Sequence, residues 1–154
     1  ACKNAGMHTA VDTSGYAKWE ILEKTAKFTD LFLYDLKIMD DELHKKYTGV
    51  SNKLILENLT YLLEMGKNVW IRLPMITGIS FTETNINQTI DFLKKQKYSI
   101  EYVHLLPFHN TAFHKYKRFG MNNIFYGAKS LTKSELEKVK VQFEEAGFQV
   151  KIGG

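Results

Sequence analysis

The sequence predicts an α/β fold built on a parallel sheet, and three observations support this. Short apolar runs of strand length alternate along the 154 residues with longer segments whose apolar residues recur at helical spacing. Polar residues follow these short runs, as at the carboxyl ends of parallel strands. The length and the 44% hydrophobic content suit one domain with one core. Strands that alternate with helices are expected to be parallel and joined by right-handed crossovers.

The first predicted strand, His8–Asp12, ends in the turn Thr13-Ser14-Gly15. Before it, residues 1–6 resemble the end of a helix, with Gly6 able to adopt the left-handed cap conformation. Residues 17–28 form the first predicted helix, which has apolar residues at helical spacing at Trp19, Ile21, Leu22 and Ala26. The second predicted strand, Leu31–Asp35, follows directly.

Two helices are predicted after the second strand. Asp40 can cap a helix that runs through Leu43 and Tyr47 and stops at Thr48-Gly49. Asn52 opens another helix, which ends at Gly66 and has one apolar face made of Ile55, Leu59, Leu62 and Leu63.

The second half continues the alternation. Strand Asn68–Leu73 is expected to break at Pro74 and the turn around Gly78. Thr82 begins a helix, and the fourth strand, Ile100–Leu106, stops at Pro107. Residues 110–129 lack periodicity and indicate a long surface connection.

The last predicted elements are one helix and one strand. Thr132 and Glu135 form a capping box for the helix, which ends at Gly147 and turns Leu136, Val139 and Phe143 inward. The final strand is Phe148–Ile152. The chain thus holds four strand-helix units, too few to close a barrel of eight, so the sheet is either open or part of a barrel whose beginning is missing.

Composition excludes several classes of function. The single cysteine, Cys2, excludes an internal disulfide framework and an all-cysteine metal or iron-sulfur site made by this chain alone, and it favours the reducing cytoplasm. The net charge of +4 comes from scattered lysines, so no nucleic-acid partner is expected. No apolar stretch approaches the length of a membrane span, and the histidines lack metal-ligand spacing. The start without methionine indicates that the chain begins inside something larger.

Polar residues converge where the predicted strands end: Asp12 and Thr13, Asp35 and Lys37, the loop 74–78, and His109. Because side chains alternate along a strand, Asp35 and Lys37 should point one way and Leu36 the other. A carboxylate beside an ammonium suits a polar, zwitterionic ligand. The alternatives are a salt bridge that closes a core strand and, for the set as a whole, turn residues that serve their own backbone.

Five segments, in this order and at this spacing, resemble the glycyl-radical-enzyme activating enzymes: Asp12–Tyr16, Leu33–Asp40, Thr48–Asn52, Ile71–Pro74 with Gly78, and Leu105–His109. The resemblance covers nearly the whole chain. It implies a radical S-adenosylmethionine enzyme with a partial (βα)6 barrel, of which this chain is the C-terminal four units. The closing residues 151–154 look like a family terminus.

One part of the family pattern is absent. The family's N-terminal Cys-x3-Cys-x2-Cys motif, which holds a 4Fe-4S cluster, and the glycine-rich strand after it have no counterpart here, and Cys2 lies outside any such motif. The chain as given is therefore expected to be inactive, and the full-length parent to be an anaerobic, cytoplasmic oxidoreductase.

The resemblance also implies a chemistry and a site. The cluster donates an electron to S-adenosyl-L-methionine, and the resulting 5'-deoxyadenosyl radical takes a hydrogen atom from a backbone glycine of a partner enzyme. By resemblance, Asp35, Leu36, Lys37 and His109 bind S-adenosyl-L-methionine, and no catalytic residue lies in this chain. Asp12 and Thr13 match positions that can hold a monovalent cation.

The implied partners are a glycyl radical enzyme, such as pyruvate formate-lyase or an anaerobic ribonucleotide reductase, and an electron donor such as flavodoxin or ferredoxin. Loss of the first barrel units should bare apolar faces, so self-association of the chain is expected. The alternative function is a complete small α/β binding module for an anionic or nucleotide-like ligand, without catalysis.

Overall fold

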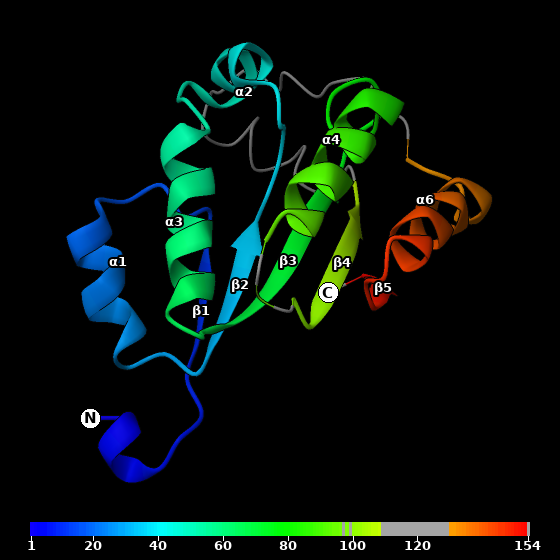
Figure 1. The fold of residues 1–154 in the computed structure, drawn as a ribbon. Coiled ribbons are helices and arrows are strands. Elements are labelled where there is room, and N and C mark those ends of the chain that lie inside the picture. Colours follow the sequence, from blue (N-terminus) through cyan, green and yellow to red (C-terminus); the bar gives the residue numbers. More distant parts are fainter. Residues whose placement is uncertain (97, 99, 109–129, 154) are drawn as a thin grey trace, which may run out of the picture.

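The strands form one five-stranded parallel sheet whose spatial order follows the sequence. The computed structural model describes residues 1–96, 98, 100–108 and 130–153 (Figure 1). The strands are β1 (Ala10–Thr13), β2 (Leu31–Asp35), β3 (Asn68–Met75), β4 (Tyr102–Pro107) and β5 (Val150–Ile152). Every neighbouring pair is parallel, which confirms the predicted fold class.

The helices connect these strands and cover one face of the sheet. A 3-10 turn, η1 (Lys3–Ala5), precedes the sheet, and the α-helices are α1 (Trp19–Ala26), α2 (Asp41–Thr48), α3 (Lys53–Glu64), α4 (Glu83–Lys94) and α6 (Lys133–Glu145). Figure 1 shows α3 and α4 in front of the sheet, α1 to the left of α3, and α2 beyond the end to which the arrow of β2 points. Helix α2 therefore lies at the carboxyl edge of the sheet.

The two faces of the sheet differ because side chains alternate along each strand. The helix-covered face holds the core, with residues of at most 4% exposure: Phe32, Tyr34, Val69, Ile71, Leu73, Met75, Val103 and Leu105. The opposite face, which no described helix covers, carries polar and aromatic residues that include Asp35, Trp70, Arg72 and Tyr102. Polar strand residues can be accommodated there because the core lies on the other side.

Strand β3 differs from its prediction, since it runs through Pro74 to Met75 instead of breaking at Leu73. The N–H of Leu36 donates to the carbonyl of Arg72, so Arg72 and, two residues later, Pro74 turn their main-chain groups toward β2. The last residue pair of the β2–β3 ladder is Asp35 with Arg72, so Pro74, which has no N–H, lies just beyond the point where that ladder stops.

The other boundaries agree with the sequence to within a few residues. Asp40 and Thr82 accept N-cap hydrogen bonds, and the capping box of Thr132 and Glu135 is present. Gly6 adopts the left-handed conformation predicted for it. The predicted connection 110–129 lies outside the described residues. None of the described helices is long and apolar enough to span a membrane.

Candidate functional site

Four charged residues form a continuous chain of ion pairs on the helix-free face. Lys37 Nζ lies 2.9 Å from Asp35 Oδ2. Arg72 Nε lies 3.0 Å from Asp35 Oδ1, and Arg72 Nη1 lies 2.6 Å from Asp12 Oδ2. The register places Asp35 beside Arg72 on the adjacent strand, and β1 brings Asp12 to the far side of the guanidinium. Three neighbouring strands thus deliver alternating charges to one place.

The two middle residues of this series of ion pairs, Asp35 and Arg72, are partly buried, and one of their contacts lacks hydrogen-bond geometry. The side chains of Asp35 and Arg72 are 17% and 22% exposed. Although Arg72 Nε and Asp35 Oδ1 are in ion-pair range, their contact lacks hydrogen-bond geometry, and both atoms are buried without a hydrogen-bond partner. The two atoms face each other 3.0 Å apart, so each compensates the other's charge although the hydrogen-bond angle is poor.

The structure brings together some of the residues that the sequence singled out. Asp35 and Lys37 point the same way and touch, as the alternation predicts. Leu36 points into the core and is 3% exposed, so only its backbone could reach a ligand on the helix-free face. His109 lies outside the described residues, and its assignment stays a prediction.

Asp12 and Thr13 lie on opposite faces of β1. Asp12 pairs with Arg72, whereas the hydroxyl of Thr13 accepts a hydrogen bond of 2.9 Å from the N–H of Gly15. Within the described part of the chain, no group of three or more histidine, cysteine, aspartate or glutamate side chains could hold a metal ion. Of the two residues, only Asp12 offers its side chain to the face that carries Asp35.

Sequence reasoning did not single out Arg72 as a site residue. The available signal was a lone arginine between apolar neighbours, Ile71 and Leu73, within an alternating strand. An arginine at such a position is costly to bury unless it is paired. Its two carboxylate partners come from other strands, so only the pairing of the strands reveals its place.

A cavity of about 330 Å³ lies next to Lys37, at the carboxyl edge of the sheet. Its walls come from the segment after β2, from α2 and from the end of β3 with the loop that follows, and they comprise Lys37, Ile38, Tyr47, Thr48, Pro74, Ile76, Ile79 and Ser80. These walls are mostly apolar. The arrangement therefore places a cation at the mouth of an apolar pocket.

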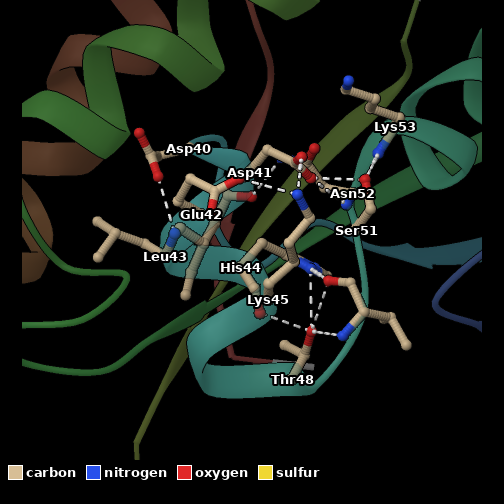
Figure 2. Close-up of polar contacts among 12 residues, drawn as sticks. Asp40, Asp41, Glu42, Leu43, His44, Lys45, Thr48, Ser51, Asn52 and Lys53 are labelled. Atoms are coloured by element: carbon tan, nitrogen blue, oxygen red, sulfur yellow. Dashed lines mark hydrogen bonds and ion pairs between the residues drawn. The ribbon is translucent and has the colours of Figure 1, made fainter.

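The wall formed by α2 is fixed by the polar network that Figure 2 shows around the corner between α2 and α3. Asp41 accepts hydrogen bonds from Ser51 Oγ (2.6 Å) and from the N–H of Asn52 (3.0 Å), and it pairs with Lys45 (2.8 Å). The hydrogen bond from Lys45, followed by that from Ser51, lowers the pKa of Asp41 well below its ordinary range. These contacts hold the carboxylate ionised at the start of α2.

Buried His44 strengthens the same corner. Its Nδ1 lies 2.7 Å from the carbonyl of Val50 and 2.9 Å from the hydroxyl of Thr48. The carbonyl requires a donor, so the His44 ring carries a proton on Nδ1. The segment Thr48–Asn52, one of the five that resemble the family, thereby closes α2 onto α3.

The end of β1 is held by a close contact between Gly15 and Tyr34. Gly15 has φ +72°, and a Cβ there would lie 1.6 Å from Tyr34 Oη, so only glycine fits. Tyr34 donates to the carbonyl of Ile55 at 2.6 Å, and burial raises the pKa of its hydroxyl. Asn58 donates to the carbonyls of Gly15 and Ala17, both at 2.8 Å, and thereby ties this loop to α3.

Comparison with known proteins gives the site its context. No family model matches the chain. The trans-4-hydroxy-L-proline dehydratase activating enzyme of Clostridioides difficile is 43% identical over 99% of this chain, and the choline trimethylamine-lyase activating enzyme of Oleidesulfovibrio alaskensis is 40% identical over 99%. The pyruvate formate-lyase 1-activating enzyme of Escherichia coli is 34% identical over 97%. The chain belongs to the family of glycyl-radical-enzyme activating enzymes.

The match covers only part of these activating enzymes. The chain spans about half the length of the first two relatives, 51% and 50%, and 61% of the third. A crystal structure of a domain of the pyruvate-formate lyase-activating enzyme from Bacteroides vulgatus superposes with a TM-score of 0.83 at 28% identity, covering 99% of this chain and 85% of that one. The chain therefore corresponds closely to a portion of the family that has been crystallised separately.

More distant structures show the fold. Streptococcus suis SuiB bound to S-adenosylmethionine has a TM-score of 0.70 at 16% identity, with 99% of this chain covered but 34% of SuiB. A radical SAM methyltransferase from Sphaerobacter thermophilus has a TM-score of 0.71 at 14% identity, with 96% of this chain and 41% of that chain covered. The five parallel strands match part of a radical SAM partial barrel, as the resemblance implied.

Proposed function

We propose that this chain is the S-adenosylmethionine-binding part of an activating enzyme that generates a glycyl radical on a partner enzyme. The observation that carries the proposal is the Asp35–Lys37 pair beside the apolar cavity at the carboxyl edge, in a chain of this family. The carboxyl edge is where sheets of this kind bind their ligands.

The residues present fit the chemistry of S-adenosylmethionine. This ligand combines an ammonium, a carboxylate and ribose hydroxyls with a flat base and a sulfonium. Asp35 supplies an acceptor for hydroxyl or ammonium groups, while Lys37 and Arg72 supply cationic donors for a carboxylate. The apolar walls around Pro74 and Ile76 suit the base, and about 330 Å³ falls at the lower end of small-ligand pocket volumes.

In this proposal the protein binds and orients while the cofactor supplies the radical chemistry. The ion pairs between Arg72 and its two aspartates keep the Asp35 carboxylate in place before a ligand arrives, which lowers the ordering cost of binding. The apolar walls of the cavity would exclude water from the end of the cofactor where the radical forms. His109 completes the set of residues proposed to bind S-adenosylmethionine. Asp12 and its neighbour in sequence, Thr13, are the residues proposed for the monovalent cation.

The residues present do not fit a 4Fe-4S cluster. Such a cluster is held by cysteine thiolates, and the chain has one cysteine, Cys2, which is exposed. We therefore propose that the cluster ligands lie in a longer protein and that the 154 residues alone do not cleave S-adenosylmethionine. The electron donor, flavodoxin or ferredoxin, would act on that longer protein.

The proposed partner is defined as a class. The relatives named above activate, by their names, a hydroxyproline dehydratase, a choline trimethylamine-lyase and a pyruvate formate-lyase. These enzymes differ in substrate, so the shared property to carry over is a partner that holds a glycyl radical. Self-association of the chain, through apolar surface bared by the absence of the first barrel units, stays a prediction, which sedimentation at several concentrations would test.

The test compares variants of the longer protein, with its cluster reconstituted under anaerobic conditions. Asp35→Ala and Lys37→Ala should each weaken S-adenosylmethionine binding by about tenfold or more, as expected for loss of a charge-assisted hydrogen bond. Lys94→Ala, which removes an exposed lysine at the end of α4, is the matched control and should leave affinity unchanged.

Two results would contradict the proposal. Unchanged affinity in both site variants would show that the ion pair is only structural. Binding of the cofactor by the longer protein without any reductive cleavage would instead support a binding module.

A further inference from the structure

Two asparagines enclose residues 37–39, which lie just after β2. Asn85, in the first turn of α4, accepts from the N–H of Met39 (2.8 Å) and donates to the carbonyls of Lys37 (3.3 Å) and Ser80 (2.9 Å). Asn52, at the N-cap of α3, donates to the carbonyls of Ile38 (3.0 Å) and Met39 (2.7 Å). We call this arrangement the asparagine bracket.

The bracket replaces the hydrogen bonds that regular structure would otherwise supply. The carbonyls of three consecutive residues, 37 to 39, and the N–H of Met39 all have side-chain partners. A loop backbone without such partners would bond to water and sample several conformations. Asn52 is 3% exposed and opens α3 without making the usual cap bond, so its amide is available for the loop.

The bracket bears directly on Lys37. Its Nζ reaches Asp35 at 2.9 Å, and the backbone of residue 37 is the fixed end of that side chain, so holding the backbone limits the positions that the charge can take. Asn85 holds the carbonyl of Lys37 itself and, through Ser80, ties it to the loop that lines the other wall of the cavity. The side-chain amide of Asn85 thus links the backbone of Lys37 to the loop that contains Ser80.

We propose that Asn52 and Asn85 are positioning residues that hold Lys37 for the cofactor. The expected effect on cofactor binding rests on the proposed function. The fixing of residues 37–39 rests only on the hydrogen bonds described above. Asparagine suits the role because one short side chain offers both a donor and an acceptor, which alanine lacks and which aspartate offers only in part.

Asn58 provides a matched control. Like Asn52 it is buried, and like both asparagines of the bracket it donates two hydrogen bonds to main-chain carbonyls, but it lies within α3 and ties the β1–α1 loop. A purely structural loss should therefore appear in Asn58→Ala as well, whereas an effect on the segment 37–39 should not.

The first experiment needs no cofactor. In the 154-residue chain, Asn85→Ala should speed amide hydrogen exchange at Met39 by about tenfold under native conditions, through local opening. Asn58→Ala should leave that amide protected. Asn85→Asp, which keeps the acceptor for Met39, should give a smaller change and serves if the alanine variant does not fold. Equal exchange at Met39 in wild type and both Asn85 variants would overturn the bracket.

The second experiment tests whether the asparagines act through Lys37. In the longer protein, Asn85→Ala and Asn52→Ala should each weaken S-adenosylmethionine binding by about fivefold when Lys37 is present. In a Lys37→Ala background the same changes should cost less than about twofold, since the group they position is gone. Additive losses would contradict a positioning role. Failure of the wild-type protein to bind would refute the proposed function, while the exchange result would still decide the bracket.

Discussion

Replacing Gly15 by alanine gives the sharpest test of how the β1 end is built. Alanine at φ +72° costs about 1–2 kcal/mol relative to glycine. The new methyl group would also lie 1.6 Å from Tyr34 Oη, so the tyrosine ring must move. Moving it forces repacking, which costs about 1–3 kcal/mol, and loses the hydrogen bond to Ile55, which contributes about 1 kcal/mol.

We therefore expect Gly15→Ala to lower the free energy of unfolding by about 3–6 kcal/mol, a large part of the stability of an ordinary domain. Urea unfolding followed by circular dichroism measures it. Gly49→Ala is the matched control, because Gly49 has φ +82° but nothing within 4 Å of the added Cβ, so it should lose only about 1–2 kcal/mol.

The comparison isolates the close contact from the backbone conformation. If the two variants unfold within about 0.5 kcal/mol of each other, the argument from Tyr34 is wrong. A second check is Tyr34→Leu, which removes the atoms in the way. The double variant should then be less destabilised than the two single changes added together.

Two further predictions concern charges. Arg72→Met should lower the free energy of unfolding by about 1–2 kcal/mol, because it leaves the partly buried Asp35 with one cation. It should also weaken cofactor binding in the longer protein. Unchanged values in both measurements would contradict a role for this series of ion pairs. The lowered pKa of Asp41 stabilises the fold at pH above the ordinary value of 3.8, and this contribution is lost as pH falls through the lowered value. Asp41→Asn should therefore flatten the acid side of the stability–pH profile, and an unaltered profile would contradict that assignment.

The fold was largely predictable because its signals are local. Strand and helix periods, the caps at Asp40 and Thr82 and the box at Thr132 each depend on a few neighbouring residues. Pro74 was the exception, since proline reads as a strand breaker unless one knows that the neighbouring strand has already ended.

The site was predictable only in part. The pairing of Asp35 with Lys37 follows from the alternation of side chains at the end of β2 and in the residues just after it. Arg72 lies 37 positions beyond Asp35, and Asn85 lies 48 positions beyond Lys37. These contacts depend on strand register and on the approach of α4 to the segment after β2. No local sequence pattern predicts contacts between residues so far apart in the chain. His109 is a prediction that lies outside the described residues.

The placement of Leu36 links ligand capture to the integrity of the whole domain. Its side chain is anchored in the interior, while the two charges flanking it in sequence face outward. The backbone between the two charges therefore cannot shift without moving that buried side chain. A ligand held by this pair therefore raises the temperature at which the sheet melts, and a mutation deep in the core weakens capture without touching the ligand.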